Sequence, residues 1–359
     1  MKAAVLYQYN TPLSVEEVEY RGPQQGQVLV RMVGSGVCHT DLAIIEDQLF
    51  APFPLPIILG HEGAGIVEEA GPGVTAVKAS DHVILSWVPN CGVCRYCTIG
   101  RPALCVGMMR GTVATHFSKG EQNIFNFGPT SFSEYSIVPE SACIKIREDA
   151  PLEKVCLIGC GVMTGAGAAM FTAKVAPGSS VAIIGCGGVG LNTIQGAALC
   201  GAEKIIAVDI LDNKLEFART FGATHTVNAK NHDPVEAVKE LTGGQGVEYS
   251  FEVIGAAQTI RQAYDMLAAG GTCVVVGAAP RGTEVSLPTQ SFFDEKGIIG
   301  SRYGSARMRV DIPRLVDLYM DKKIKLDELI TQSLPLTEIN KAFDDLKAGK
   351  VARSVIKYS

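Results

Sequence analysis

The sequence lacks several features that mark whole classes of protein. Only 19% of its residues are charged, the formal net charge is -5, and no run of lysine or arginine stands out. Such a chain offers no strong attraction to nucleic acid or to an anionic membrane, and we expect neither as a partner. Internal repeats and low-complexity tracts are also missing, which excludes solenoid and fibrous architectures.

Long apolar runs are absent as well. The opening MKAAVLYQYNTP lacks the apolar core of a signal peptide, and the stretch from Val181 to Leu191 is interrupted by glycines and too short to span a bilayer. We therefore expect a cytoplasmic protein. Because a reducing compartment disfavours disulfides, the 11 cysteines indicate bound metal instead.

A chain of 359 residues exceeds one ordinary core, so two domains are expected. The first 150 or so residues contain short strand-like runs broken by glycine and proline, which is typical of a β-rich domain. From about residue 179, apolar strands alternate with helices, which predicts a doubly wound α/β domain with a parallel sheet. Later segments are predicted as helices at 259–270, 313–321 and 336–347, and as a closing strand over RSVIKY.

A glycine-rich turn follows the predicted strand VAIIG and opens a helix. Its G-x-G-x-x-G spacing permits a tight turn, a close backbone approach to a pyrophosphate and tight helix–strand packing. Asp209 ends the next strand, where a carboxylate can accept both ribose hydroxyls and repel a 2′-phosphate, which favours NAD over NADP. Alternatively, the turn serves only packing, with Asp209 capping the next helix. The candidate coenzyme residues of this turn are Gly185, Gly187, Gly188, Val189 and Gly190.

Four cysteines at positions 91, 94, 97 and 105 form the pattern C-x₂-C-x₂-C-x₇-C. Thiolates this close together can complete a tetrahedral zinc site with no open position, so the expected role is structural. An iron–sulfur cluster is the competing interpretation, although its last spacing and following proline differ from those here.

A second group is scattered: Cys38 in VCHTD, His61 and Glu62 in GHEGAG, and Cys160 in GCGVMTG. Spacing alone cannot show that these residues meet. The run GHEGAGIVEEAGPGV, however, resembles the signature of the zinc-containing alcohol dehydrogenases of the medium-chain dehydrogenase/reductase superfamily. The four-cysteine loop, GCGVMTG, the glycine turn and the C-terminal ARSVI are similar to family motifs in the same order, over essentially the whole chain.

The resemblance implies a fold, an activity and two zinc ions per chain. A GroES-like β-rich catalytic domain would comprise residues 1–161 and 301–359, and a Rossmann NAD-binding domain residues 162–300. An alcohol and its aldehyde would be interconverted by hydride transfer to NAD. Cys38, His61 and Cys160 would bind the catalytic zinc and leave a fourth position for water or alcohol, and the four-cysteine loop would bind a structural zinc.

The resemblance also implies roles for the neighbouring side chains. Glu62 would be a carboxylate that transiently approaches the metal, Asp41 would fix the tautomer of His61, and Thr40 would take the alcohol proton. The implied coenzyme contacts are Thr164 at the nicotinamide, Asp209 and Lys214 at the adenosine ribose, His39 and Arg353 near the pyrophosphate, and Ile254.

Two positions depart from the family pattern. His39 stands where an arginine is frequent, which gives a weaker and titratable pyrophosphate contact. Ala43 stands where many relatives end the proton relay in histidine, so the route beyond Thr40 stays open.

The lone tryptophan, Trp87, precedes the cysteine loop, where relatives place a pocket aromatic; core packing is the alternative. A pocket indole would suit a primary alcohol, such as a benzylic or allylic one. The segment Gly111–Phe132 resembles the longer connection of dimeric members, which predicts a homodimer, with a tetramer as the alternative.

Two rival functions remain open. An S-(hydroxymethyl) thiol dehydrogenase, acting on formaldehyde adducts, could use Glu46, Asp47 and Arg110 to contact a charged adduct. A non-catalytic NAD-binding structural protein would have no use for an open metal site. Five cysteines, at positions 143, 156, 186, 200 and 273, receive no role beyond the core.

Overall fold

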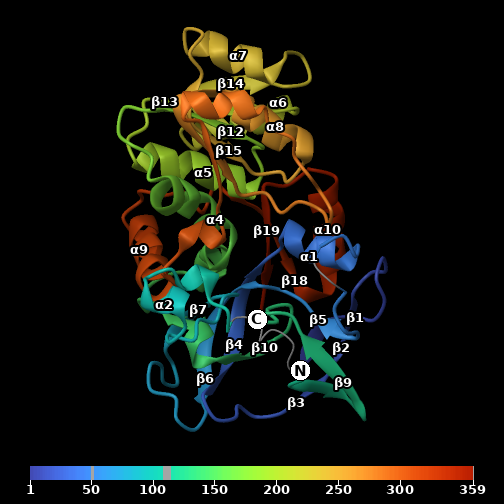
Figure 1. The fold of residues 1–359 in the computed structure, drawn as a ribbon. Helices are drawn as coiled ribbons and strands as arrows, with labels where there is room; N and C mark the ends of the chain where they lie inside the picture. Colours follow the sequence, from blue (N-terminus) through green and yellow to red (C-terminus); the bar gives the residue numbers. More distant parts are fainter. Residues whose placement is uncertain (50–51, 108–114, 359) are drawn as a thin grey trace. The chain divides into compact units, whose positions relative to one another are not determined.

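The structure is a computed structural model and describes residues 1–49, 52–107 and 115–358. The chain divides into two compact units, Met1–Gly161 with Arg307–Ser359, and Val162–Ala306. The second unit thus ends at Ala306, whereas the sequence predicts residue 300 for this boundary. Figure 1 labels the elements of both units.

The first unit is built on two sheets. The larger has the order β11-β7-β6-β4-β19-β18, with β10 also paired to β4, and the smaller the order β2-β1-β5-β9-β8-β3. The larger sheet comprises β4 (Gln27–Gly36), β6 (Glu62–Ala70), β7 (His82–Leu85), β10 (Tyr135–Pro139), β11 (Cys143–Lys145), β18 (Ile330–Pro335) and β19 (Arg353–Lys357). The smaller comprises β1 (Lys2–Leu6), β2 (Ser14–Glu17), β3 (Glu19–Tyr20), β5 (Ile57–Ile58), β8 (Phe117–Lys119) and β9 (Gln122–Asn126).

Alternating apolar residues explain the central strands of the larger sheet. Val28, Val30 and Met32 of β4 lie in one buried cluster with Val67 of β6 and Leu85 of β7. This period of two places one face of each strand in the core. The C-terminal β19 pairs antiparallel with β4 through Val355 and Gly36, so the end of the chain completes the sheet begun near its start.

Short helices surround these sheets. They are α1 (His39–Ile45), α2 (Arg95–Thr98), α3 (Leu152–Val155), α9 (Met308–Met320) and α10 (Ile339–Lys347). The helix predicted from Pro313 is wrong at its start, because α9 begins at Met308 and contains Pro313. Buried Met308, Ile312 and Leu315 give α9 an apolar face that begins before the proline, and this pattern extends the helix.

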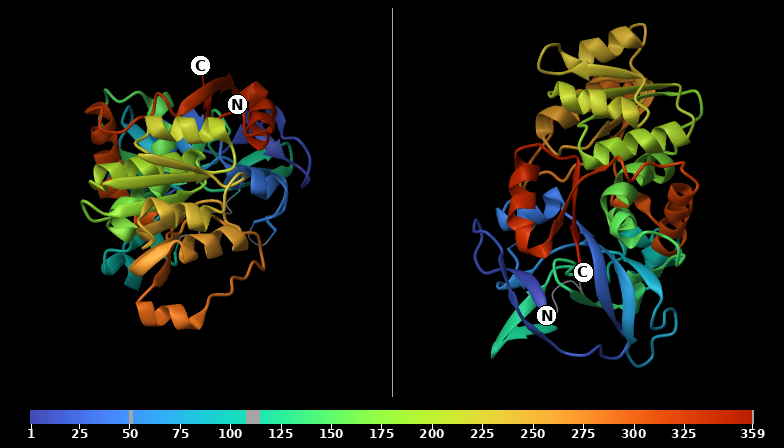
Figure 2. Two further views of the ribbon diagram at one scale, coloured as in Figure 1. Left: turned by 90° about the horizontal axis from the view of Figure 1, so that it is seen from above. Right: turned by 180° about the vertical axis from the view of Figure 1, so that it is seen from behind.

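The second unit contains a six-stranded parallel sheet of order β14-β13-β12-β15-β16-β17. The strand order runs outward from β12 in both directions, and helices connect the parallel strands (Figure 2). The strands are β12 (Ser180–Ile184), β13 (Lys204–Asp209), β14 (His225–Asn228), β15 (Val247–Glu252), β16 (Leu267–Val275) and β17 (Gly297–Gly300). The helices are α4 (Gly161–Gly167), which begins at the unit boundary, α5 (Gly188–Leu199), α6 (Asp212–Thr220), α7 (Pro234–Leu241) and α8 (Ala257–Asp265).

The helix predicted over 259–270 is also wrong at its end. α8 ends at Asp265, and β16 starts at Leu267. Leu267 pairs with Val247 of β15, and this strand contact outweighs the helical propensity of Leu-Ala-Ala. Among the described residues, no single helix is long and apolar enough to cross a membrane; only Leu152–Gly159 with Gly161–Ala173, two pieces bent by 54°, passes that test together.

Candidate functional site

Four residues that are far apart in the sequence meet in the first unit. One ligand atom each of Cys38, His61, Glu62 and Cys160 lies within 4.8 Å of the others, and all four residues are buried. Cys38 precedes α1, His61 and Glu62 lie at the start of β6, and Cys160 follows the 3₁₀ turn Cys156–Gly159. The structure therefore brings together the scattered residues that the sequence singled out. Two sulfurs, an imidazole and a carboxylate form a donor set suited to zinc.

Asp41 positions the imidazole of this cluster. Nδ1 of His61 lies 3.0 Å from Oδ1 of Asp41, and the Gly60 N–H donates to the same oxygen at 3.1 Å. Asp41 is fully buried in the first turn of α1. This contact leaves Nε2 of His61 buried and without a hydrogen-bond partner in the described chain, which fits a metal-ligating nitrogen.

The two cysteine sulfurs of the cluster share a proton unequally. The hydrogen bond with Cys160 lowers the pKa of Cys38 well below its ordinary value, against the effect of burial. The same contact, with burial, raises the pKa of Cys160. One sulfur is thus already disposed to be the thiolate that a metal requires.

Glu62 is held by a buried arginine. Nη2 of Arg353 donates to Oε2 of Glu62, while the Gly161 N–H donates to Oε1 at 3.1 Å. Burial raises the pKa of Glu62 to about 7, and the nearby guanidinium opposes this rise. A Cβ on Gly36 would lie 2.1 Å from Oε2 of Glu62, so glycine is required there. Arg353 lies against Glu62 here, and its pyrophosphate contact stays a prediction.

Thr40 and His39 directly follow the cysteine ligand Cys38, at the start of α1. Thr40 is half-buried and His39 is exposed. Ala43, on the same helix, has no side-chain group that can receive a proton. In the second unit, Thr164 is a half-buried residue of α4.

The glycine turn of the second unit has the geometry that its spacing predicts. Gly185 has φ +101°, and a Cβ on Gly190 would lie 1.8 Å from the carbonyl oxygen of Gly185. Asp209 accepts from the Cys186 N–H at 2.8 Å through Oδ2 and from the Ile210 N–H at 2.8 Å through Oδ1. Cys186 therefore connects the turn to the acidic residue through its backbone, a contact that the motif did not predict.

Apolar side chains flank this turn on the two neighbouring strands. Ile210 follows β13 and is 60% exposed, and Ile254 follows β15 and is 53% exposed. Lys214 lies one turn into α6 and is half-buried. Ile210 was not predicted as a residue beside this turn. The sequence feature that could have indicated it is an apolar residue directly after the acid that ends a strand.

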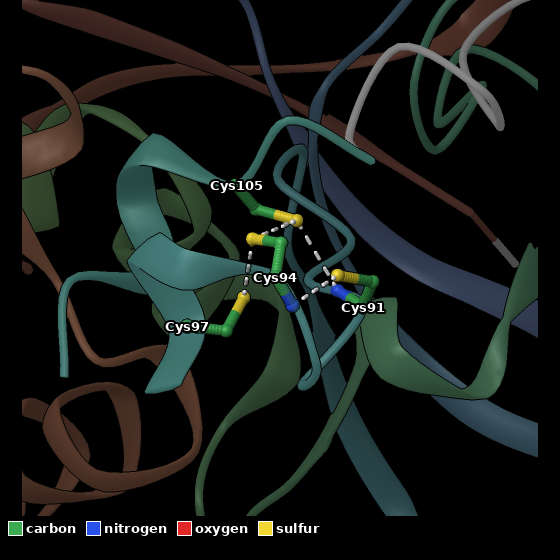
Figure 3. Close-up of side chains that lie close together, drawn as sticks. All are labelled: Cys91, Cys94, Cys97 and Cys105. Atoms are coloured by element: carbon green, nitrogen blue, oxygen red, sulfur yellow. Dashed lines mark hydrogen bonds between the residues drawn. The ribbon is translucent and has the colours of Figure 1, made fainter. Parts of the chain in front are cut away.

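The four cysteines at positions 91, 94, 97 and 105 form a compact cluster in the first unit (Figure 3). The Cys94 sulfur lies 3.6 Å from that of Cys97 and 3.9 Å from that of Cys105. Tetrahedral zinc with Zn–S of about 2.3 Å requires sulfur separations of about 3.8 Å. Backbone N–H groups of Cys97 and Val106 lower the pKa of Cys94 to about 6. The cluster fits a structural zinc.

Aromatic side chains surround the histidine of the buried cluster. The Phe127 ring meets the His61 ring edge-on with centroids 6.1 Å apart, and the Phe53 ring meets Phe127 at 5.1 Å. A Cβ on Gly128 would lie 3.8 Å from Cβ of His61 and 3.9 Å from Cβ of Trp87, so both residues lie next to Gly128. Phe53 and Phe127 were not predicted, because their proximity depends on long-range packing.

Glu46 and Asp47, the acidic residues considered as contacts for a charged thiol adduct, differ in their surroundings. Glu46 forms an ion pair with Lys347, and Asp47 has φ +52° at the end of α1. Arg110 lies outside the described residues, as does the first part of the segment Gly111–Phe132.

Comparison with known proteins identifies the family. Residues 24–148 match the alcohol dehydrogenase GroES-like domain, and residues 188–320 match the zinc-binding dehydrogenase family. The chain is 42% identical to alcohol dehydrogenase class-3 of Dictyostelium discoideum, over 99% of this chain and 97% of the relative. It is 41% identical to S-(hydroxymethyl)glutathione dehydrogenase of Paracoccus denitrificans, over 99% of both chains. The crystal structure of benzyl alcohol dehydrogenase from Acinetobacter calcoaceticus superposes with a TM-score of 0.94 at 38% identity, over 100% and 99% of the two chains.

These matches define the class as zinc-dependent oxidoreductases with a GroES-like and a Rossmann-type domain. The chain belongs to the zinc-containing alcohol dehydrogenase family of the medium-chain dehydrogenase/reductase superfamily. It is an NAD-dependent enzyme with zinc as its metal, and its substrates are small alcohols and aldehydes. The family and fold predicted from the motifs are thereby confirmed.

Proposed function

We propose that this enzyme oxidises a primary benzylic or allylic alcohol to its aldehyde with NAD. The observation that carries the proposal is the Phe127 ring beside His61, with the Phe53 ring packed against Phe127 and Trp87 next to Gly128. A planar substrate can pack edge-on or offset against such rings, which adds favourable contacts that a short aliphatic alcohol cannot make. The likeness to a benzyl alcohol dehydrogenase supports the same substrate class.

The buried cluster supplies the machinery for proton removal. Cys38, His61 and Cys160 would hold the zinc, which would polarise the alcohol oxygen and lower the pKa of its hydroxyl. Asp41 fixes the imidazole through Nδ1, which leaves Nε2 available as a ligand. Thr40 accepts the hydroxyl proton. Because residue 43 is alanine and cannot receive this proton, the proton leaves Thr40 by another route.

Glu62 is engaged by Arg353 and by the backbone. The guanidinium and the Gly161 N–H contact one oxygen each, so Cys38, His61 and Cys160 would be the ligands that hold zinc while this contact lasts. Glu62 would become available as a further ligand if the arginine contact were released.

The second unit binds the coenzyme. The Gly185–Gly190 turn and the N-terminus of α5 receive the pyrophosphate, and Asp209 with Lys214 contacts the adenosine ribose. His39, Arg353, Thr164 and Ile254 complete the set of coenzyme contacts. Ile210 and Ile254, exposed on either side of the turn, offer apolar faces to the adenine.

A second candidate substrate is an S-(hydroxymethyl) thiol adduct formed from formaldehyde. It is favoured by the names of relatives 41% to 43% identical, class-3 alcohol dehydrogenases and an S-(hydroxymethyl)glutathione dehydrogenase. Against it, Glu46, which could contact the ammonium of such an adduct, is already paired with Lys347.

NADH absorbance with a panel of alcohols separates the two candidates. We expect kcat/KM for benzyl alcohol to exceed that for ethanol by at least about tenfold, because one buried ring is worth roughly 1.5–3 kcal/mol. Trp87→Leu should lower this ratio, whereas Trp87→Phe, which keeps a ring, should retain most of it. Turnover of formaldehyde only when glutathione is present, with no benzylic preference, would establish the thiol adduct instead.

We also propose a homodimer formed through β17. This strand lies at the edge of the parallel sheet, and Ile299, Phe292 and Phe293 on and before it are 41%, 48% and 91% exposed. An apolar edge strand with open hydrogen-bonding groups is a template for pairing with another chain. Ile299→Lys should lower the mass measured by light scattering to that of one chain. Val310→Lys, which alters a 49% exposed residue of α9 in the other unit, serves as control; an unchanged mass in Ile299→Lys would refute this interface.

A further inference from the structure

The hydroxyl of Tyr9 holds the backbone of Phe53 at two points. Phe53 N–H donates to the Tyr9 oxygen at 2.6 Å, and the Tyr9 hydroxyl donates to the Phe53 carbonyl at 2.8 Å. Both backbone groups of Phe53 are therefore satisfied by one side chain from a distant part of the sequence. The contact fixes a residue that lies outside any helix or strand.

Phe53 is in turn connected to the zinc-binding histidine through one ring. Its own ring meets Phe127 at an interplanar angle of 72°, and Phe127 meets His61 at 81°. Phe53 and Phe127 are both half-buried, so neither residue is fully enclosed by the protein. They also pack against the buried cluster that includes Leu59 and Phe132, which anchors them from behind.

We propose that Tyr9 is a positioning residue that sets the preference for aromatic alcohols by holding the Phe53 ring in place. This inference rests on the proposed benzylic activity. An aromatic substrate gains from a ring only if that ring is already fixed, because ordering it on binding costs side-chain entropy. A short aliphatic alcohol does not reach these rings, so its kcat/KM does not depend on whether they are ordered.

The test compares kcat/KM for benzyl alcohol and for ethanol in Tyr9→Phe. The benzyl-to-ethanol ratio should fall about three- to tenfold, because the hydroxyl that holds the Phe53 backbone at two points is lost. The value of kcat/KM for ethanol should stay unchanged. The matched control is Tyr7→Phe, which removes a hydroxyl bonded to Glu16 on the exposed surface and should leave the ratio as it is.

A double-mutant cycle tests whether Tyr9 acts through Phe53. Phe53→Leu alone should lower the ratio at least as much as Tyr9→Phe, and adding Tyr9→Phe to it should lower the ratio no further. Additive losses would overturn the proposal, as would a fall of both kcat/KM values together with an unchanged ratio. If the wild-type enzyme shows no benzylic preference, the proposed function itself fails; if it does and Tyr9→Phe retains it, only this inference fails.

Discussion

The two candidate zinc sites of the first unit are built in opposite ways. In both, the ligand atoms lie within 4.8 Å of one another. The buried site collects Cys38, His61, Glu62 and Cys160 from three separate stretches of the chain, whereas the second takes its four thiols from the single segment Cys91–Cys105. The second is also partly open to solvent, since Cys91 is exposed.

The comparison shows that the groups in contact with the ligands suit the two sites to different roles. The four-cysteine cluster offers four sulfurs with backbone N–H partners, a donor set that would complete the coordination of a structural zinc. The buried cluster has side-chain partners, Asp41 on His61 and Arg353 on Glu62. The first contact orients the imidazole and the second engages the carboxylate, an arrangement that suits a site with a position left for substrate.

Removing a ligand from the buried site should have the largest effect on turnover. We expect Cys38→Ala to reduce kcat by at least about 10³-fold, because the metal that acidifies the alcohol is lost. Zinc measured by atomic absorption should fall from two to one per chain. Cys143→Ala, which alters a buried cysteine of β11 far from both clusters in the sequence, should change neither quantity. Persistent turnover in Cys38→Ala would remove the buried cluster from the mechanism.

Changing the partner of a ligand should have an intermediate effect. Asp41→Asn removes the charge that orients His61, and we expect the buried site to bind zinc about 10- to 100-fold more weakly. A chelator titration should show this as early loss of one zinc while the other is retained. The control is Asp81→Asn, which alters a buried carboxylate that is paired with Lys145 and belongs to neither cluster. Equal weakening of zinc binding at both clusters would contradict separate roles for the two sites.

Removing a ligand from the exposed site should affect stability more than chemistry. Cys91→Ser should lower the melting temperature by about 5 °C or more, because structural zinc contributes folding free energy. Turnover per folded chain at low temperature should stay within about twofold of wild type. Cys200→Ser, at a half-buried cysteine of the other unit, should melt normally. A loss of kcat as large as that of Cys38→Ala would mean that the two clusters are functionally equivalent.

The same contrast explains what the sequence could predict. The spacing of the four cysteines at 91, 94, 97 and 105 indicates a metal by itself, because short loops keep their residues together. The meeting of positions 38, 61 and 160 could be expected only from the resemblance to a family, since spacing carries no information on long-range folding. The glycine turn and Asp209 lie between these cases, because a βαβ unit fixes their separation locally.

What could not be predicted depends on tertiary contacts. β18 was missed because ITQSLP has polar residues on its exposed positions and gains its place by pairing with β19. The early end of α8 is decided by pairing between Leu267 and Val247. Phe53, Phe127 and Tyr9 converge from separate segments, and nothing in their local sequence marks them as part of the site.

A catalytic zinc in the buried cluster is tested most directly by measuring zinc content and NADH formation together while a chelator removes the metal. We expect two zinc ions per chain at the start, and a loss of benzyl alcohol turnover in step with the loss of only one of them. Spectroscopy of a Co²⁺-substituted enzyme would assign that ion to the site with two sulfur ligands and one imidazole. Full turnover after this ion has gone, or a fully active enzyme with a single zinc at the four-cysteine loop, would contradict a catalytic role for zinc in the buried cluster.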